Sequence, residues 1–178
     1  MKIARHFSAG SAYDFGLSPV GTAEIIAEPQ MAHTYVSNLV HYVFSTKDRR
    51  KCIGEELRPR LWAYLGGIAR ENQMKALAVG GTDDHVHVLL SLPATIAIAK
   101  AVQLLKGGSS KWINEHPGPE FHWQDGYGAF TVSVSNLDRT LDYVRKQAEH
   151  HEHRSFEEEF LALLRKHRID YDPRHVWG

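Results

Sequence analysis

From residue 33 onwards, hydrophobic positions either alternate with polar ones or recur at helical spacing, and these two periods predict the order of the elements. The segments with strand patterning are 33–45, 75–79, 84–92 and 130–134. The segments with a helical stripe are 55–72, 95–114 (interrupted at Gly107-Gly108), 137–151 and 156–166. The order strand, helix, strand, strand, helix, strand, then helices is typical of the ferredoxin-like split βαβ fold. We therefore expect an α+β protein with an antiparallel four- to five-stranded sheet, helices on one face, and additional C-terminal helices.

Residues 1–30 show neither period. Glycines and prolines interrupt every candidate segment there, and Met31 stands directly before the first strand pattern. We expect residues 1–30 to be a disordered or misassigned N-terminal extension and residues 31–178 to form a single domain. A short ordered arm that packs on this domain is the alternative.

The composition is that of an ordinary globular chain, with 43% hydrophobic residues among 178. No apolar run approaches the roughly 18 residues that a membrane span needs, and the stretch after Lys2 and Arg5 lacks the apolar segment of a signal peptide. Cys52 is the only cysteine, so an internal disulfide is impossible. We expect a cytoplasmic, reducing location and no membrane partner.

The formal net charge is zero, which argues against binding of nucleic acid through a global positive field. Basic side chains nevertheless cluster locally, and the stretches 106–112 and 121–130 add small hydroxyl groups, glycines and aromatic rings. Cations and hydroxyl groups suit phosphates and aromatic rings suit bases, although 121–130 is equally typical of a loop that closes over the core. The candidate DNA contacts with these properties are Lys47, Arg49, Arg50, Lys106, Ser109, Ser110, Lys111, Trp123 and Tyr127.

Two histidines lie two residues apart in the strand pattern at 84–92. Because side chains alternate across a strand, His85 and His87 project from one face, with their Cα atoms about 6.6–6.8 Å apart, and Val86 takes the other face. This spacing allows both imidazoles to bind one metal ion, and zinc, manganese and nickel all accept such ligands. A pair of histidines on a half-exposed strand without a ligand is the alternative.

A tyrosine stands outside the apolar stripe of the helix expected over 137–151. Tyr143 and Gln147 are one turn apart on a different face of this helix, and His150 follows after one more turn. A glutamine offers a carbonyl oxygen, and a phenol is a candidate nucleophile. On these residues alone, a surface tyrosine hydrogen-bonded to Gln147 is the simpler interpretation.

Four motifs together resemble one family. They are DHVHVLL at 84–90, SSKWIN at 109–114, WQDGYGAF at 123–130 and YVRKQAEHH at 143–151. In this order and spacing they resemble the HUH-type single-tyrosine transposases of the smallest bacterial insertion sequences, the IS200-like transposases, of which the REP-associated tyrosine transposases are a branch. The resemblance runs from about Met31 to Trp177.

The resemblance implies an enzyme that cuts and rejoins single-stranded, hairpin-forming DNA by transesterification through a 5′-phosphotyrosine intermediate. It implies that His85, His87 and Gln147 bind a divalent metal, Mg²⁺ or Mn²⁺, and that Tyr143 is the nucleophile on the C-terminal helices. It also implies a homodimer with shared active sites, in which the tyrosine helix of one subunit completes the metal site of the other.

Other functions share these motifs. In a metal-dependent phosphoesterase, water would attack and Tyr143 would only orient it. A domesticated relative would process or bind hairpin DNA without transposing, and a non-catalytic repressor would bind DNA without cutting it.

Overall fold

The computed structural model describes residues 35–150, 155–172, 174 and 176. The chain divides into two compact units, Met1–Tyr35 and Val36–Gly178, and every described helix and strand belongs to the second unit. The predicted N-terminal extension therefore lies outside the described residues. Among the described helices, none has the length and apolar character needed to cross a membrane.

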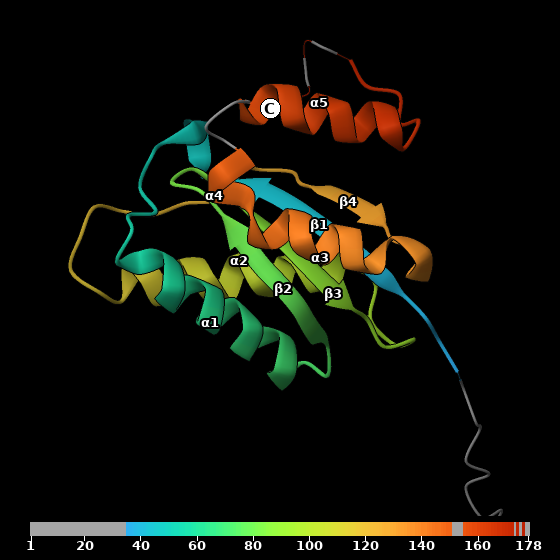
Figure 1. Ribbon diagram of the computed structural model, residues 1–178. Coiled ribbons are helices and arrows are strands. Elements are labelled where there is room, and N and C mark those ends of the chain that lie inside the picture. Colours follow the sequence, from blue (N-terminus) through green and yellow to red (C-terminus); the bar gives the residue numbers. More distant parts are fainter. Residues whose placement is uncertain (1–34, 151–154, 173, 175, 177–178) are drawn as a thin grey trace, which may run out of the picture. The chain divides into compact units, whose positions relative to one another are not determined.

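A four-stranded antiparallel sheet forms the centre of the second unit (Figure 1). Its strands are β1 (Leu39–Ser45), β2 (Lys75–Gly81), β3 (His85–Ser91) and β4 (Gly128–Thr131). They lie in the order β2-β3-β1-β4, so β3 and β1 are the central strands. The predicted α+β fold with an antiparallel sheet is confirmed.

Different helices cover the two faces of this sheet (Figure 1). On one face, α1 (Leu57–Glu71) and α2 (Ile98–Asn114) pack on alternate residues of the central strands. The residues of β1 and β3 in this main core are Val40, Tyr42, Phe44, Val86, Val88 and Leu90. The C-terminal helices lie on the other face: α3 (Leu137–Arg145), α4 (Gln147–His150) and α5 (Phe156–Lys166). The histidines of β3 point to this second face because Val86, which lies between them, points to the first.

Glycine pairs account for two differences from the predicted boundaries. β2 continues through Gly80-Gly81, and α2 runs without a break through Gly107-Gly108. A Cβ atom on Gly108 would lie 2.8 Å from Cδ1 of Ile68 in α1, so this glycine allows the two helices to pack closely. In addition, β1 begins at Leu39 rather than at residue 33.

The single helix predicted over 137–151 is wrong. α3 ends at Arg145, and Lys146 leaves the helical conformation with φ −96° and ψ 20° before α4 begins at Gln147. Tyr143 and Gln147 therefore lie on separate helices. Their relative position is set by this break and not by the period of one helix.

α5 begins with a capping box and is held to the sheet by apolar contacts. Oγ of Ser155 accepts a hydrogen bond from the backbone N–H of Glu158, whose side chain accepts one from the N–H of Ser155. The buried residues that join this helix to the sheet are Val43, Phe130, Phe156, Leu163 and Leu164. This packing turns one charged residue of the helix, Glu159, into the interior.

Gly80 in β2 is a point of close approach between the sheet and α3. A Cβ atom there would lie 1.9 Å from the backbone oxygen of Val144, the residue after Tyr143. We expect Gly80→Ala to force α3 away from β2 and to lower the free energy of unfolding by about 1–3 kcal/mol, the usual cost of overpacking. Denaturant unfolding measures this change.

Gly66→Ala in α1 is the matched control, because a Cβ atom at Gly66 would meet no atom within 4 Å. Alanine is better than glycine inside a helix by about 1 kcal/mol, so this variant should be neutral or stabilised. An equal loss of stability in both variants would contradict the assigned role of Gly80.

Candidate active site

β3 carries His85 and His87 onto the face of the sheet that the C-terminal helices cover. Both side chains are fully buried, and their ring centroids are 5.1 Å apart. Phe156 of α5 packs 4.7 Å from the ring of His85, and Tyr143 of α3 packs edge-on 5.9 Å from the ring of His87. The two imidazoles are therefore more buried than a half-exposed strand would make them.

The Nδ1 atom of each imidazole has a fixed neighbour. His85 Nδ1 lies 2.7 Å from Oδ1 of Asp84 and 2.9 Å from Oγ1 of Thr82. His87 Nδ1 lies 2.9 Å from Nε2 of His41. Burial lowers the pKa of His41 well below its usual value, and His87 lowers this pKa further, so the ring of His41 is neutral at pH 7. These partners fix the orientation of both rings of β3.

Asp84, directly before β3, is a buried carboxylate with side-chain partners in Thr82, His85 and Arg49. Burial raises its pKa, but hydrogen bonds to His85 and Arg49 outweigh this effect and hold the pKa well below its usual range. Nη2 of Arg49 donates to Oδ2 at 2.7 Å, while Oδ1 faces His85. A negative charge at Asp84 therefore holds His85 through Nδ1 at neutral pH.

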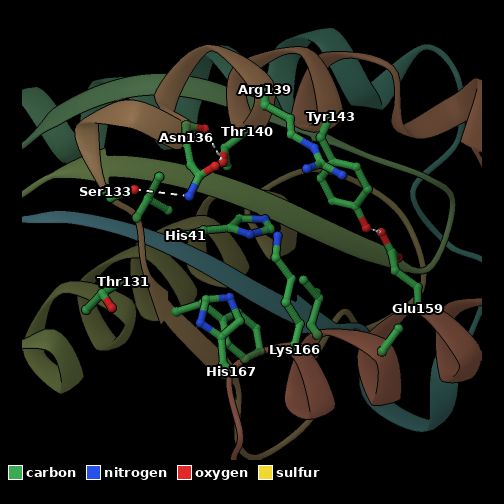
Figure 2. Close-up of a pocket in the computed structure, with 14 residues that line it drawn as sticks. His41, Thr131, Ser133, Asn136, Arg139, Thr140, Tyr143, Glu159, Lys166 and His167 are labelled. Atoms are coloured by element: carbon green, nitrogen blue, oxygen red, sulfur yellow. Dashed lines mark hydrogen bonds between the residues drawn. The ribbon is translucent and has the colours of Figure 1, made fainter.

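Glu159 of α5 brings a second buried carboxylate to the opposite edge of the two rings. Only 3% of Glu159 is exposed, and its Oε2 lies 3.8 Å from Nε2 of His85 and 3.4 Å from Nε2 of His87. Its Oε1 accepts a hydrogen bond from the hydroxyl group of Tyr143 (Figure 2). The same Oε1 accepts a hydrogen bond of 2.9 Å from Nε2 of Gln147. One carboxylate thus connects the two histidines, the tyrosine and the glutamine.

The sequence patterns did not reveal Glu159 as a site residue. Phe156, Phe160 and Leu163 recur at helical spacing, and Glu159 stands within this apolar stripe. A carboxylate on the buried side of a helix requires a partner. The position of Glu159 within the apolar stripe was the one signal in the sequence that pointed to it as a site residue.

The donor atoms at this place fit a divalent cation. His85, His87 and Glu159 each offer one ligand atom, and these atoms lie within 4.8 Å of one another. Nε2 of His87 and Oε1 of Gln147 are buried and have no hydrogen-bond partner among the described residues. Buried polar atoms normally have a partner, and a cation would provide one for these lone pairs. Imidazole, carboxylate and amide ligands together suit a first-row divalent metal.

Two of the candidate DNA contacts have buried side chains. Ser109 donates a hydrogen bond of 2.6 Å to the backbone oxygen of Leu105 and accepts one of 2.9 Å from Nε1 of Trp123. The ring of Trp123 packs edge-on against Phe44, with centroids 4.8 Å apart. The structure therefore places Ser109 and Trp123 in the core between α2 and the sheet.

Arg49 is occupied by contacts within the chain. Its guanidinium forms ion pairs with Asp84 at 2.7 Å and with Glu157 at 2.6 Å, and it lies 4.3 Å from the ring centroid of Phe156. Arg49 thereby joins the carboxylate beside His85 to the first turn of α5.

The other candidate DNA contacts are at least partly exposed: Lys47, Arg50, Lys106, Ser110, Lys111 and Tyr127. Lys106, Ser110 and Tyr127 line one surface pocket beside α2. The ammonium group of Lys106 donates to the backbone oxygens of Gln124 and Gly126 at 2.6 and 2.9 Å. These three residues are up to about twenty positions apart in the sequence, and the structure brings them together in this pocket. Lys47, Arg50 and Lys111 lie outside it.

Within this chain, Tyr143 meets His87 and Glu159. The exchange of the tyrosine helix between two subunits stays a prediction, as does the homodimer itself.

Comparison with known proteins gives the same family as the motifs. The chain matches the family described as "Transposase IS200 like" over residues 34–147. It is 30% identical over 130 residues to the transposase for insertion sequence element IS200 of Salmonella typhimurium. That match covers 68% of this chain and 84% of the relative.

Two solved structures are similar to the chain. A crystal structure from Deinococcus radiodurans, assigned as a transposase, is 26% identical with a TM-score of 0.51, and the match covers 64% of this chain and 93% of that one. A REP-associated tyrosine transposase bound to a REP hairpin has a TM-score of 0.53 and 13% identity over 66% of this chain and 71% of that one, a likeness of fold alone. The family match and the relative show that the chain belongs to the IS200-like transposases, a family of enzymes that cut DNA.

Proposed function

We propose that this chain cuts and rejoins single-stranded DNA by transesterification, with Tyr143 as the nucleophile and a 5′-phosphotyrosine intermediate. Family membership supports this reaction. The observation that carries it is the meeting of His85, His87, Gln147 and the hydroxyl of Tyr143 at the buried carboxylate of Glu159. Hairpin-forming DNA is the expected substrate, in keeping with the REP hairpin bound by the REP-associated tyrosine transposase.

Mg²⁺ or Mn²⁺ is the expected cofactor, and His85, His87, Gln147 and Glu159 would hold it. A divalent cation at this place would polarise the scissile phosphate and offset the charge that develops in the transition state. Mg²⁺ favours oxygen ligands, whereas Mn²⁺ also accepts imidazole, so the mixed donor set supports either ion.

The partners at Nδ1 prepare both imidazoles for this role. An imidazole that binds a cation through Nε2 carries its proton on Nδ1. The charged carboxylate of Asp84 would accept the hydrogen bond from that proton at His85, and the neutral ring of His41 offers a nitrogen acceptor at His87. Such outer partners fix the tautomer and raise the basicity of the ligand.

Glu159 orients the phenol of Tyr143 beside the same place. A phenol with an ordinary pKa of about 10 is a weak nucleophile at neutral pH. The hydrogen bond from the hydroxyl of Tyr143 to Oε1 of Glu159 places an acceptor for its proton. In the reaction, the bond from the phenol oxygen to phosphorus forms while the bond from phosphorus to the 3′ oxygen breaks. Glu159 takes up the proton of the phenol, and a proton from water converts the departing 3′ oxygen into a hydroxyl group. Attack by another 3′-hydroxyl reverses these steps, so strands rejoin without ATP.

Tyr143→Phe tests the nucleophile, because it removes the hydroxyl and keeps the ring that packs on His87. We expect loss of cleavage of single-stranded DNA from the flanks of the gene in the presence of Mn²⁺. The covalent protein–DNA adduct on a denaturing gel should disappear as well. Tyr64→Phe is the control, since Tyr64 stacks on Trp112 between α1 and α2. This variant should keep both the cleavage and the covalent adduct. Cleavage that persists in Tyr143→Phe without an adduct would assign the attack to water.

Glu159→Gln tests the metal site without DNA. The variant removes an anionic donor and should weaken Mn²⁺ binding by about tenfold or more, since even partners outside the ligand shell contribute about 10–100-fold to metal affinity. Electron paramagnetic resonance of unbound Mn²⁺ gives the affinity. Glu158→Gln, exposed on the same helix, is the control and should bind Mn²⁺ like the unaltered chain. Equal affinities in both variants would exclude Glu159 from the metal site.

A further inference from the structure

We propose that a pocket beside Tyr143 binds one nucleotide of the single-stranded DNA next to the phosphate that Tyr143 attacks. This inference rests on the proposed function and adds the place that positions the strand. The tyrosine pocket, as we call it, is lined by residues that include Phe130, Arg139, Tyr143, Glu159, Leu163 and Lys166.

The tyrosine pocket is a cavity of about 220 Å³ formed by β4, the segment after it, α3 and α5. Figure 2 shows Tyr143 and Glu159 at one side of it and Thr131 and His167 at the other. Consecutive nucleotides of one strand are separated by about 3.4 Å or more along its axis. A strand whose phosphate meets the hydroxyl of Tyr143 therefore has a neighbouring nucleotide within reach of this cavity.

The walls of the tyrosine pocket suit a nucleobase. Phe130, Val132 and Leu163 contribute apolar surface, and the ring of His167 packs on Phe130 with centroids 4.8 Å apart. Burial and the charge of Lys166 lower the pKa of His167, so its ring is uncharged at pH 7. Aromatic and apolar side chains bind bases by stacking with little demand on sequence.

Polar groups on one wall can read the edge of a base. Oγ of Ser133 accepts a hydrogen bond of 3.0 Å from Nδ2 of Asn136, and the hydroxyl of Thr140 donates one of 2.8 Å to the backbone oxygen of Asn136. Hydroxyl and amide groups can both donate and accept, which allows them to distinguish one base edge from another. This wall therefore adds a preference for particular bases to the stacking surface.

Arg139 and Lys166 supply positive charge from two sides of the tyrosine pocket. Arg139 reaches into it from α3 and Lys166 from α5, where Lys166 extends toward His41 (Figure 2). Both side chains are exposed, and neither forms an ion pair with another residue that the structure describes. In a chain of zero net charge, two such cations beside an apolar cavity are suited to the phosphates on either side of a bound base.

Part of this lining lies beyond the region that matches the family. The match ends at residue 147, whereas Leu163, Lys166 and His167 follow it on or after α5. The tyrosine pocket would therefore give this chain a nucleotide preference that the matched region does not determine by itself.

Abasic scanning tests the proposal. The probe is a fluorescein-labelled single-stranded oligonucleotide from the flanks of the gene, in which one nucleotide after another is made abasic. We expect one position next to the cut to weaken binding by about tenfold, the usual scale for the loss of one stacked base. Ala162→Phe places a ring in the tyrosine pocket and should weaken binding of the intact probe by a similar factor. In this variant, the same abasic position should have no further effect.

An abasic effect of equal size in both proteins would overturn the proposal, and so would unchanged affinity in Ala162→Phe. Because the added ring can also disturb packing, a second pair of variants uses exposed side chains. Lys166→Glu should weaken binding and flatten its dependence on salt, whereas Arg165→Glu, on the same helix but outside the pocket lining, should change neither. Equal effects of the two substitutions would overturn the assignment of Lys166 to a subsite.

These binding measurements require neither metal nor cleavage. If one abasic position weakens binding in the unaltered chain but not in Ala162→Phe, and no tyrosine adduct forms, the proposed reaction is refuted and the tyrosine pocket remains a DNA site. If the adduct forms but no abasic position has this effect, only the assignment of the tyrosine pocket as a DNA site is refuted. Failure to bind any oligonucleotide would overturn the inference.

Discussion

A carboxylate held inside the protein is the constraint on which the arrangement of the C-terminal helices depends. Glu159 is buried, and a buried charge is stable only when it is paired or hydrogen-bonded. Its neighbours come from three elements: the histidines of β3, Tyr143 of α3 and Gln147 of α4. The position of this one group therefore fixes three helices relative to the same face of the sheet.

The same constraint explains why the two faces of the sheet are built differently. Under α1 and α2, the central strands contribute apolar side chains, so hydrophobic packing holds these two helices to the sheet. On the other face, His41, His85 and His87 lie beside Val43 and Leu89, and every buried polar atom there requires a partner. In the proposed reaction a cation is one of these partners, so metal binding and the docking of α5 through Glu159 are thermodynamically linked.

The sequence predicts the order of strands and helices because burial of one face makes hydrophobic residues recur at the period of a strand or of a helix. The period of a strand also places His85 and His87 on one face. The break at Lys146 escapes such reasoning because lysine is a good helix former. The position of α3 follows from contacts in the folded chain, such as that of Val144 with Gly80. Residue type also cannot separate a nucleic-acid surface from a core. Trp123 has the chemistry of a base-stacking residue, yet its indole N–H is satisfied by Ser109 inside the protein.

The end of the family match divides the candidate site unevenly. His85, His87, Tyr143 and Gln147 fall within residues 34–147, whereas Glu159 falls outside. The proposed nucleophile and three proposed ligands are thus supplied by the shared region, and α5 adds a carboxylate that contacts all of them. This helix also forms one wall of the tyrosine pocket through Leu163 and Lys166. Because one rigid helix of 11 residues carries both the carboxylate and that wall, any shift of α5 must change the ligand geometry and the fit of the DNA strand together.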